Sequence, residues 1–219
     1  SITLPSRKHL RNISSISTVL QNSQPLKKTK LLDLQSISSS TTSSIVLLSL
    51  LQDFLSSKNA SFTCKEQELL VRSILLKIPY ILSILATNKG KTLSYFLTAA
   101  LATSNITIVV LPLVGLKQDV LRRARDYNIP CCIYEDSNAF LNLTLVSIET
   151  VILSTQFNNS LARLISNNKV DKIIIDECHL VITSSNYRSI MSRVKALISL
   201  QVQFVFLSGT VPLYIEQAL

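Results

Sequence analysis

The amino-acid sequence predicts an α/β fold in which a parallel sheet is covered by helices on both faces. The first observation behind this prediction is an alternation along the chain, where short apolar runs are separated by longer segments with helical spacing. The second is that several of these runs are apolar at nearly every position, as in strands buried on both faces. Because strand and helix succeed one another repeatedly, the strands are expected to run parallel.

Six short runs are the predicted strands. The run ITIVVL at 106–111 is typical, because its β-branched side chains suit a buried strand of a parallel sheet. The predicted strands are residues 80–85, 106–111, 131–134, 143–148, 172–177 and 203–208.

Six longer segments show the spacing of apolar residues that is typical of helices. Two of them precede the first predicted strand, and the other four lie between later strands. The predicted helical segments are residues 45–57, 64–78, 93–102, 116–127, 161–168 and 187–200.

An uncharged stretch of 24 residues covers positions 93–116, and its length is that of a membrane span. The polar residues TSN at 103–105 and Pro112 interrupt it, and it divides into a helix-like half and the β-branched run at 106–111. We therefore interpret this stretch as part of a buried core and expect no membrane association.

Residues 1–43 differ in composition from the rest of the chain. The net charge is +9, and residues 1–60 hold seven lysines and arginines against two acidic residues, a surplus of five. The Ser/Thr run at 36–44 offers a core little to bury. We interpret 1–43 as a disordered basic tail, whose charge either attracts nucleic-acid phosphate or merely keeps the tail solvated. Residues 44–219 are the predicted folded domain.

The cysteine pattern indicates free thiols. None of the spacings matches a CxxC zinc pair or the disulfide framework of a small secreted domain, so no structural zinc is expected. The amino terminus also lacks the apolar core and cleavage site of a signal peptide. A reducing, intracellular compartment is therefore predicted. The cysteines are Cys64, Cys131, Cys132 and Cys178.

The stretch ATNKGKT at 86–92 lies between a predicted strand and a predicted helix. A triphosphate needs inward-pointing N–H groups at a helix start, a lysine for the outer phosphates and a hydroxyl for Mg²⁺. Gly90, Lys91 and Thr92 supply the last three residues of that pattern in order. By itself the tripeptide also fits a lysine-rich turn.

The stretch IIIDECH at 173–179 places two carboxylates at the end of another apolar strand. Such a pair can divide the work of an ATPase, with Asp176 in the Mg²⁺ shell and Glu177 orienting the attacking water. Alternatively, it is an acidic strand end that caps a following helix. Ligands of parallel sheets bind at the carboxyl ends of the strands. Together with the loop at 86–92, the pair therefore predicts an ATPase site.

With these motifs in order, the sequence resembles the first RecA-like lobe of superfamily 2 helicases, in the RecQ-like branch. DECH at 176–179 and LSGT at 207–210 match the second and third motifs of that superfamily. SFTCKEQE at 61–68 resembles the Phe…Gln motif of the RecQ branch, LPLVGLKQD at 111–119 resembles its motif Ia, and VSIET at 146–150 stands where RecQ-like proteins carry a short motif near the DNA path.

The likeness covers residues 60–219 and extends to the RecQ-like telomere-linked helicases of fungi, as EQELL, DECHL and the Tyr-Arg pair of SSNYRSIM suggest. It implies ATP and Mg²⁺ as cofactors, single-stranded or forked DNA as partner, a nuclear location and ATP-dependent 3′–5′ strand separation. In the family, ATP is hydrolysed between two RecA-like lobes. We expect the second lobe to be absent from this chain and the chain alone to be weakly active.

The resemblance also assigns catalytic and nucleotide-binding roles. It implies that Lys91 binds the β and γ phosphates, that Thr92 and Asp176 hold Mg²⁺, and that Asp176, Glu177 and Lys91 form the catalytic set. Gln67 is expected to read the adenine edge through its amide, unless it is an ordinary exposed residue. The predicted nucleotide-binding residues are Gln67, Thr87, Asn88, Lys89, Gly90, Lys91 and Thr92.

Further residues are predicted to couple the nucleotide to nucleic acid. His179, Ser208 and Thr210 would relay between the two sites, although each also fits an ordinary polar residue at a strand end. For nucleic acid, Tyr187 would stack on a base, or else pack on the sheet at a helix start. Arg188 and Lys117 would contact phosphate. Lys117 shares its predicted helix with three arginines and could instead belong to a solvated face; these are Arg122, Arg123 and Arg125.

Four positions depart from the family pattern. Asn88 stands where the family has a glycine, and asparagine is the residue that best tolerates a left-handed backbone after glycine. Lys89 adds a charge, Thr63 replaces an arginine, and Gly209 replaces an alanine. These departures leave open a non-catalytic nucleic-acid-binding module with a decayed ATP site. A P-loop protein of another class, such as a small kinase, is the third alternative, against which LSGT and EQE speak.

Overall fold

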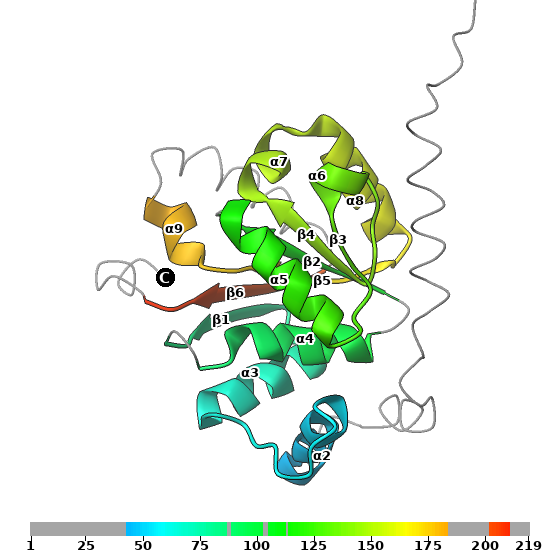
Figure 1. Ribbon diagram of the computed structural model, residues 1–219. Coiled ribbons are helices and arrows are strands. Elements are labelled where there is room, and N and C mark those ends of the chain that lie inside the picture. The colour runs from blue at the N-terminus through cyan, green and yellow to red at the C-terminus, as the bar shows by residue number, and fades with distance from the viewer. Residues whose placement is uncertain (1–42, 87–88, 103–104, 113, 184–201, 211–219) are drawn as a thin grey trace, which may run out of the picture. The chain divides into compact units, whose positions relative to one another are not determined.

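The computed structural model describes residues 43–86, 89–102, 105–112, 114–183 and 202–210. Within them the strands form one six-stranded sheet in the order β1-β6-β5-β2-β4-β3 (Figure 1). Every neighbouring pair is parallel, which confirms the predicted α/β class. The strands are β1 Tyr80–Ile84, β2 Ile106–Leu111, β3 Cys131–Ile133, β4 Leu143–Ser147, β5 Val170–Ile175 and β6 Gln203–Ser208.

The described helices include five that match predicted segments and three short ones that were not predicted. The predicted helix at 187–200 and residues 1–42 of the predicted tail at 1–43 lie outside the described residues, while Ser43 is the N-cap of α2. Tyr134, predicted as strand, instead begins a short helix. The helices are α2 Ser44–Phe54, α3 Lys65–Leu75, α4 Lys91–Leu101, α5 Val114–Asp126, α6 Tyr134–Ser137, α7 Ile148–Leu153, α8 Thr155–Ser166 and α9 Cys178–Thr183.

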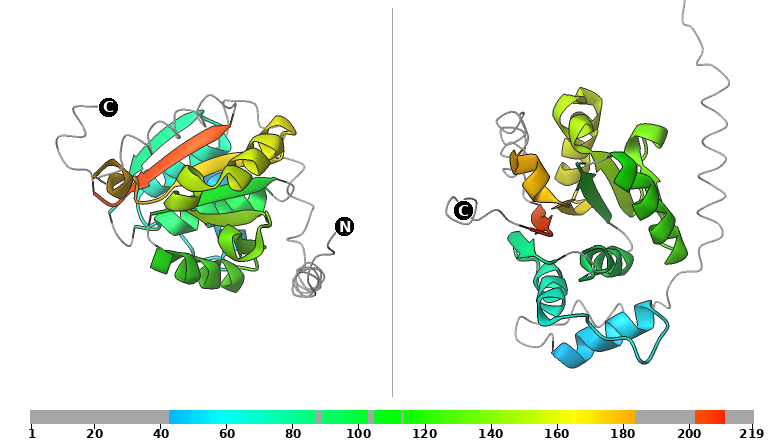
Figure 2. Two further views of the ribbon diagram at one scale, coloured as in Figure 1. Left: turned by 90° about the horizontal axis from the view of Figure 1, so that it is seen from above. Right: turned by 60° about the vertical axis from the view of Figure 1, so that its left-hand side comes forward.

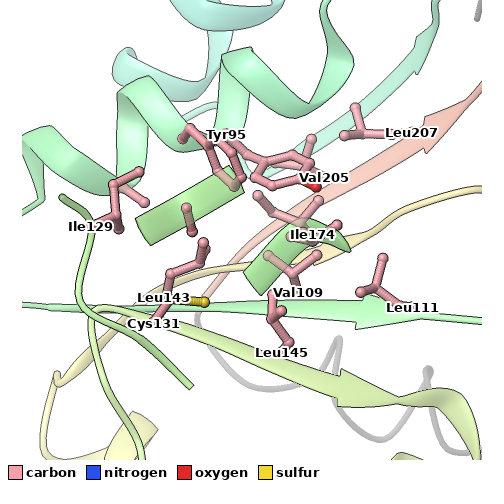
Figure 3. Close-up of a cluster of buried hydrophobic side chains, with 14 of the residues drawn as sticks. Tyr95, Val109, Leu111, Ile129, Cys131, Leu143, Leu145, Ile174, Val205 and Leu207 are labelled. Atoms are coloured by element: carbon pink, nitrogen blue, oxygen red, sulfur yellow. The ribbon is translucent and has the colours of Figure 1, made fainter. Parts of the chain in front are cut away.

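The sheet is buried on both faces, as its apolar strands predict. Alternate residues of each strand point to opposite faces, so Ile174 and Val205 pack with α3, α4 and α5 in one core (Figure 3). Ile173 and Phe204 pack with α7 and α8 in the other. Figure 2 shows these helices on the two sides of the sheet. Beyond α3, helix α2 adds an outer layer through Leu47 and Leu51, which pack with residues of α3 and α4.

The uncharged stretch at 93–116 holds most of α4 and all of β2. Among the described residues, no helix combines the length and the apolar character that crossing a membrane requires. The helix-and-strand interpretation of this stretch is confirmed.

The topology brings the carboxyl ends of β1, β6 and β5 together. Ile84 at the end of β1 is paired with Ser208 at the end of β6, and Phe206 is paired with Ile175 at the end of β5. The loops that follow these strands therefore meet at one edge of the sheet. The ends of β2, β4 and β3 continue that edge on the other side.

Candidate active site

The loop after β1 turns into α4 at Gly90, which has a left-handed backbone with φ of 80°. A Cβ atom at this position would lie 2.2 Å from Nε2 of Gln67, far inside contact distance. Backbone conformation and close packing therefore both require glycine here.

The side chain of Gln67 fastens this loop to the start of α3. Its Oε1 accepts hydrogen bonds from the N–H and the hydroxyl of Thr63, at 2.8 and 3.0 Å, and its Nε2 donates to the carbonyl of Gly90 at 3.1 Å. The Thr63 hydroxyl also donates to the carbonyl of Lys89 at 3.0 Å. Gln67 is 1% exposed, so it is not an ordinary surface residue. Adenine reading by Gln67 stays a prediction.

The part that Thr63 plays in this arrangement was not predicted from the sequence motifs. Its spacing of four residues before Gln67, at the start of a helix, was the available signal. Thr63 was treated only as the replacement of an arginine.

Lys91 begins α4 and reaches the end of β5. Its Nζ donates to Oε1 of Glu177 at 2.7 Å, and the two side chains are 9% and 24% exposed. The two strand-end motifs, 86 positions apart, thus meet in one ion pair. Glu177 has φ of 48°, a conformation that is costly for a residue with a Cβ and that is typical of functional sites.

Glu177 is held ionised by its surroundings. Burial opposes its charge, but the hydrogen bond from Lys91, the N–H of Gly209 and the nearby charges of Lys91 and His179 together lower its pKa. The Gly209 N–H donates to Oε2 at 3.1 Å. A carboxylate held in this state can accept a proton or orient a water molecule.

Asp176 has the opposite balance. It is 7% exposed, and burial together with the neighbouring charge of Glu177 raises its pKa to about 6. Its Oδ1 accepts a hydrogen bond from the Glu177 N–H at 3.0 Å. Two carboxylates therefore share one lysine in a mostly buried site, and this surplus of negative charge fits a divalent cation.

The donor set also fits Mg²⁺. Mg²⁺ prefers hard oxygen ligands and is usually held by one or two carboxylates together with substrate phosphates and water. Asp176 supplies such a carboxylate, and Thr92, in the first turn of α4, supplies a hydroxyl.

The three predicted coupling residues form a continuous chain of contacts with Glu177. Nδ1 of His179 lies 3.3 Å from Oε2 of Glu177 and 2.9 Å from the Ser208 hydroxyl. The Ser208 hydroxyl in turn contacts the backbone of Thr210, whose N–H is 3.3 Å away. A change at Glu177 can therefore be passed to the end of β6.

Of the other predicted site residues, the structure describes Lys89 and Lys117. Thr87, Asn88, Tyr187 and Arg188 lie outside the described residues. Lys89 is exposed, and its backbone N–H donates to the carbonyl of Ala86.

Lys117 lies on α5, at the other half of the sheet edge, where it is 6% exposed. Its Nζ is 3.3 Å from Oε1 of Glu135, which follows β3. The same oxygen accepts hydrogen bonds from the Ser147 N–H at 2.7 Å and the Thr150 hydroxyl at 2.8 Å. Lys117 is thus held in an ion pair rather than on a solvated face, and its contact with phosphate stays a prediction.

Comparison with known proteins places this geometry in context. Residues 64–218 match the family model described as DEAD/DEAH box helicase. The ATP-dependent helicase SGS1 of Saccharomyces cerevisiae is 29% identical over 115 residues, which are 45% of this chain and 8% of that protein. The chain therefore spans a small part of that relative.

The fold also resembles a solved structure, the crystal structure of DUF1998 helicase MrfA bound to DNA. The TM-score is 0.60, and the match covers 74% of this chain and 25% of that one. The sequence identity is 16%, so this likeness concerns the fold alone.

Proposed function

Because the chain belongs to the DEAD/DEAH box helicase family, we propose that it is the ATP-binding lobe of a RecQ-like DNA helicase. The observation that carries the proposal is the ion pair between Lys91 and Glu177 at 2.7 Å, which joins the phosphate-loop motif to the acidic strand end. The similarity to SGS1 supports the RecQ-like branch.

In this proposal the residues at the carboxyl ends of β1 and β5 share the binding and hydrolysis of ATP. Lys91 leaves Glu177 to contact the outer phosphates, Thr92 and Asp176 hold Mg²⁺, and Glu177 orients the attacking water. Mg²⁺, when bound, neutralises charge that develops on the phosphates. The released Glu177 remains ionised because the Gly209 N–H still donates to it.

Coupling to nucleic acid would run through the chain from Glu177 to His179, Ser208 and Thr210. For such coupling, the nucleotide state has to change a contact elsewhere in the protein. The series of contacts that starts at Glu177 reaches the end of β6. The partner is proposed to be single-stranded or forked DNA, and the location nuclear, on the resemblance to RecQ-like proteins.

Hydrolysis at full rate is proposed to need a second lobe, as in the family. An arginine supplied across such a cleft is worth about 10³ to 10⁵ in rate. We therefore expect the isolated 219-residue chain to bind Mg²⁺-ATP, to hydrolyse it slowly and not to unwind duplexes. Sustained strand separation by this chain alone would contradict that expectation.

The first test is a titration of the purified chain with a fluorescent ATP analogue in the presence of Mg²⁺. Lys91→Ala should lose most of the binding, whereas Lys169→Ala, which changes an exposed lysine next to the opposite end of β5, should bind as the unchanged chain does. If neither the unchanged chain nor Lys91→Ala binds, the ATP site fails and the non-catalytic nucleic-acid-binding module remains.

The second test concerns the substrate class. The slow ATPase should be stimulated by single-stranded DNA and not by small phosphate acceptors, which separates a helicase lobe from a small kinase. For the basic helix, replacing Lys117, Arg122, Arg123 and Arg125 together should reduce the salt dependence of DNA binding. An unchanged salt dependence would remove α5 from the proposed DNA surface.

A further inference from the structure

The backbone at the end of the phosphate-loop motif is fastened at two consecutive carbonyl groups. The Thr63 hydroxyl donates to the carbonyl of Lys89 at 3.0 Å, and Nε2 of Gln67 donates to the carbonyl of Gly90 at 3.1 Å. Gln67 lies in the first turn of α3 and Thr63 just precedes that helix, which packs beside α4 (Figure 1). The loop is therefore attached to an element that the GKT tripeptide does not contain.

These two contacts fix the direction of the two N–H groups that follow. In a trans peptide the C=O and the next N–H point in opposite directions, and the described residues contain no cis peptide bond. Because the carbonyls of Lys89 and Gly90 point toward α3, the N–H groups of Gly90 and Lys91 point away from it. Backbone N–H groups at a helix start are donors for phosphate. The contacts from Thr63 and Gln67 thus orient two such donors.

The amide of Gln67 is already engaged at both of its ends. An amide oxygen has two lone pairs, and Oε1 of Gln67 accepts hydrogen bonds from the N–H and the hydroxyl of Thr63 at 2.8 and 3.0 Å. Reading adenine needs an acceptor and a donor that are both available side by side. Gln67 is 1% exposed, and its amide packs so closely on Gly90 that a Cβ there would lie 2.9 Å from Cδ. The amide therefore serves the loop and not a base.

We propose that Thr63 and Gln67 are positioning residues for the triphosphate, which hold the N–H groups of Gly90 and Lys91 toward the phosphates, and that the site accepts nucleoside triphosphates without distinguishing adenine from guanine. The proposal rests on the proposed ATP-binding function. It takes the place of the adenine-reading role that the resemblance implies for Gln67. The recognition is of phosphate, because both side chains act on the backbone of the loop.

The test is a competition measurement with the full 219-residue chain. A fluorescent ATP analogue labelled on the ribose is displaced, in the presence of Mg²⁺, by ATP, by GTP or by inorganic tripolyphosphate. We expect ATP and GTP to displace it at equal concentrations. Gln67→Ala should weaken all three competitors by the same factor, about 5- to 10-fold, because each of them loses the same oriented donors.

Thr63 offers a second pair of variants, and its exposed position makes unfolding of these variants unnecessary to invoke. Thr63→Val removes the hydroxyl and should weaken all three competitors by about two- to fivefold, since one neutral donor is lost. Thr63→Ser keeps the hydroxyl and should bind as the unchanged chain does.

A matched control is Gln203→Ala, which changes a buried glutamine that fastens the other end of α3. Nε2 of Gln203 donates to the carbonyls of Ile74 and Ile78 at 3.2 and 2.9 Å. The control should lower the melting temperature without nucleotide and leave the three affinities unchanged. If it weakened the competitors as much as Gln67→Ala does, the effect would come from a loosened α3, and the positioning role would be wrong.

Two further outcomes would overturn the proposal while the ATP site stands. One is a preference for ATP over GTP in the unchanged chain; if Gln67→Ala removed that preference, Gln67 would be the reader of adenine. The other is an unchanged affinity for tripolyphosphate in both Gln67→Ala and Thr63→Val, because the two side chains would then serve only the fold.

The failure of the proposed function has a different signature. If the unchanged chain does not bind the labelled analogue in the presence of Mg²⁺, the ATP site itself fails, and the roles of Thr63 and Gln67 fail with it. If the unchanged chain, Thr63→Ser and Gln203→Ala bind alike, and Gln67→Ala and Thr63→Val are weakened equally for all three competitors, both proposals are supported.

Discussion

The two halves of the sheet edge each carry a lysine–glutamate ion pair, and the pairs differ in how completely their charges are balanced. The side chains of Lys91 and Glu177 are 9% and 24% exposed, and those of Lys117 and Glu135 are 8% and 26% exposed, so the burial of the two pairs is nearly the same. Both pairs join a helix start or helix face to the end of a strand. A difference between them therefore comes from their neighbours.

In the pair of Lys117 and Glu135, the glutamate has an ion-pair partner and two further hydrogen-bond donors. Burial opposes the charge of Glu135, but hydrogen bonds from the Ser147 N–H and the Thr150 hydroxyl outweigh it and lower its pKa to about 2. At the first pair a second carboxylate, Asp176, shares the lysine, and its pKa is raised to about 6. The second pair is thus a closed structural contact, while the first keeps unbalanced charge of the kind expected where a ligand binds.

The largest expected effect is a separation of function between the two lysines. Lys91→Ala should weaken Mg²⁺-ATP binding by about 10- to 100-fold, since a hydrogen bond to a charged group is worth about 1.5–3 kcal/mol. Lys117→Ala should leave nucleotide affinity unchanged and lower the midpoint of denaturant unfolding. Nucleotide titration and urea unfolding of both variants measure the two effects. Equal nucleotide affinities of the two variants would contradict the proposed difference between the two ion pairs.

The next effect is on the stability of the nucleotide-free protein. Asp176→Asn removes a carboxylate that burial and Glu177 make costly to ionise, while the amide oxygen can still accept the Glu177 N–H. We expect the free energy of unfolding at pH 7 to rise by about 1–2 kcal/mol, from a pKa difference of roughly two units with part lost to burial of the amide. The same variant should lose Mg²⁺-dependent nucleotide binding. A less stable Asp176→Asn would show that the charge is compensated.

Glu135→Gln should act in the opposite direction. The folded-state pKa of Glu135 is lowered to about 2, so its ionisation stabilises the fold above the unfolded-state pKa, and this stability is lost as the pH falls from about 4.5 toward 2. We expect a loss of about 1 kcal/mol at pH 7, because the site is partly solvated. Urea unfolding from pH 7 to pH 3 should find the two proteins converging at the acid end. A constant difference would contradict the assignment.

The smallest effect is expected at a solvent-exposed ion pair on α5, the helix that also carries Lys117. Arg122 contacts Asp119 at 2.6 Å, with side chains 70% and 50% exposed. Water and salt screen such pairs, so Arg122→Ala should not move the unfolding midpoint measurably. A shift as large as that of Lys117→Ala would mean that burial does not separate the two contacts.

The sequence predicted the order of strands and helices well where the pattern is long. Residues 106–111 and 203–208 coincide with β2 and β6, because their length and their β-branched and aromatic residues are typical of buried strands. The short helices α6, α7 and α9 were missed. Four to six residues are too few to show a helical period, and α7 begins where the Ser147 hydroxyl accepts the Thr150 N–H at 3.1 Å.

For the candidate site, the sequence predicted the motifs but not all of their partners. Lys91, Asp176 and Glu177 were singled out from local patterns, whereas Glu135 carried no motif that marked it. Glu135 becomes notable only because Lys117, Ser147 and Thr150 surround it.

By itself, the sequence determined the succession of elements, the parallel sheet and the positions of the two strand-end motifs, because these depend on periodicity and on residues close together in the chain. Only the tertiary structure decided which charges are balanced and which are not. That balance depends on burial and on distances in space between side chains that are far apart in the sequence. Lys117 and Glu135 are separated by 18 positions, and Lys91 and Glu177 by 86. Local patterns contain neither quantity.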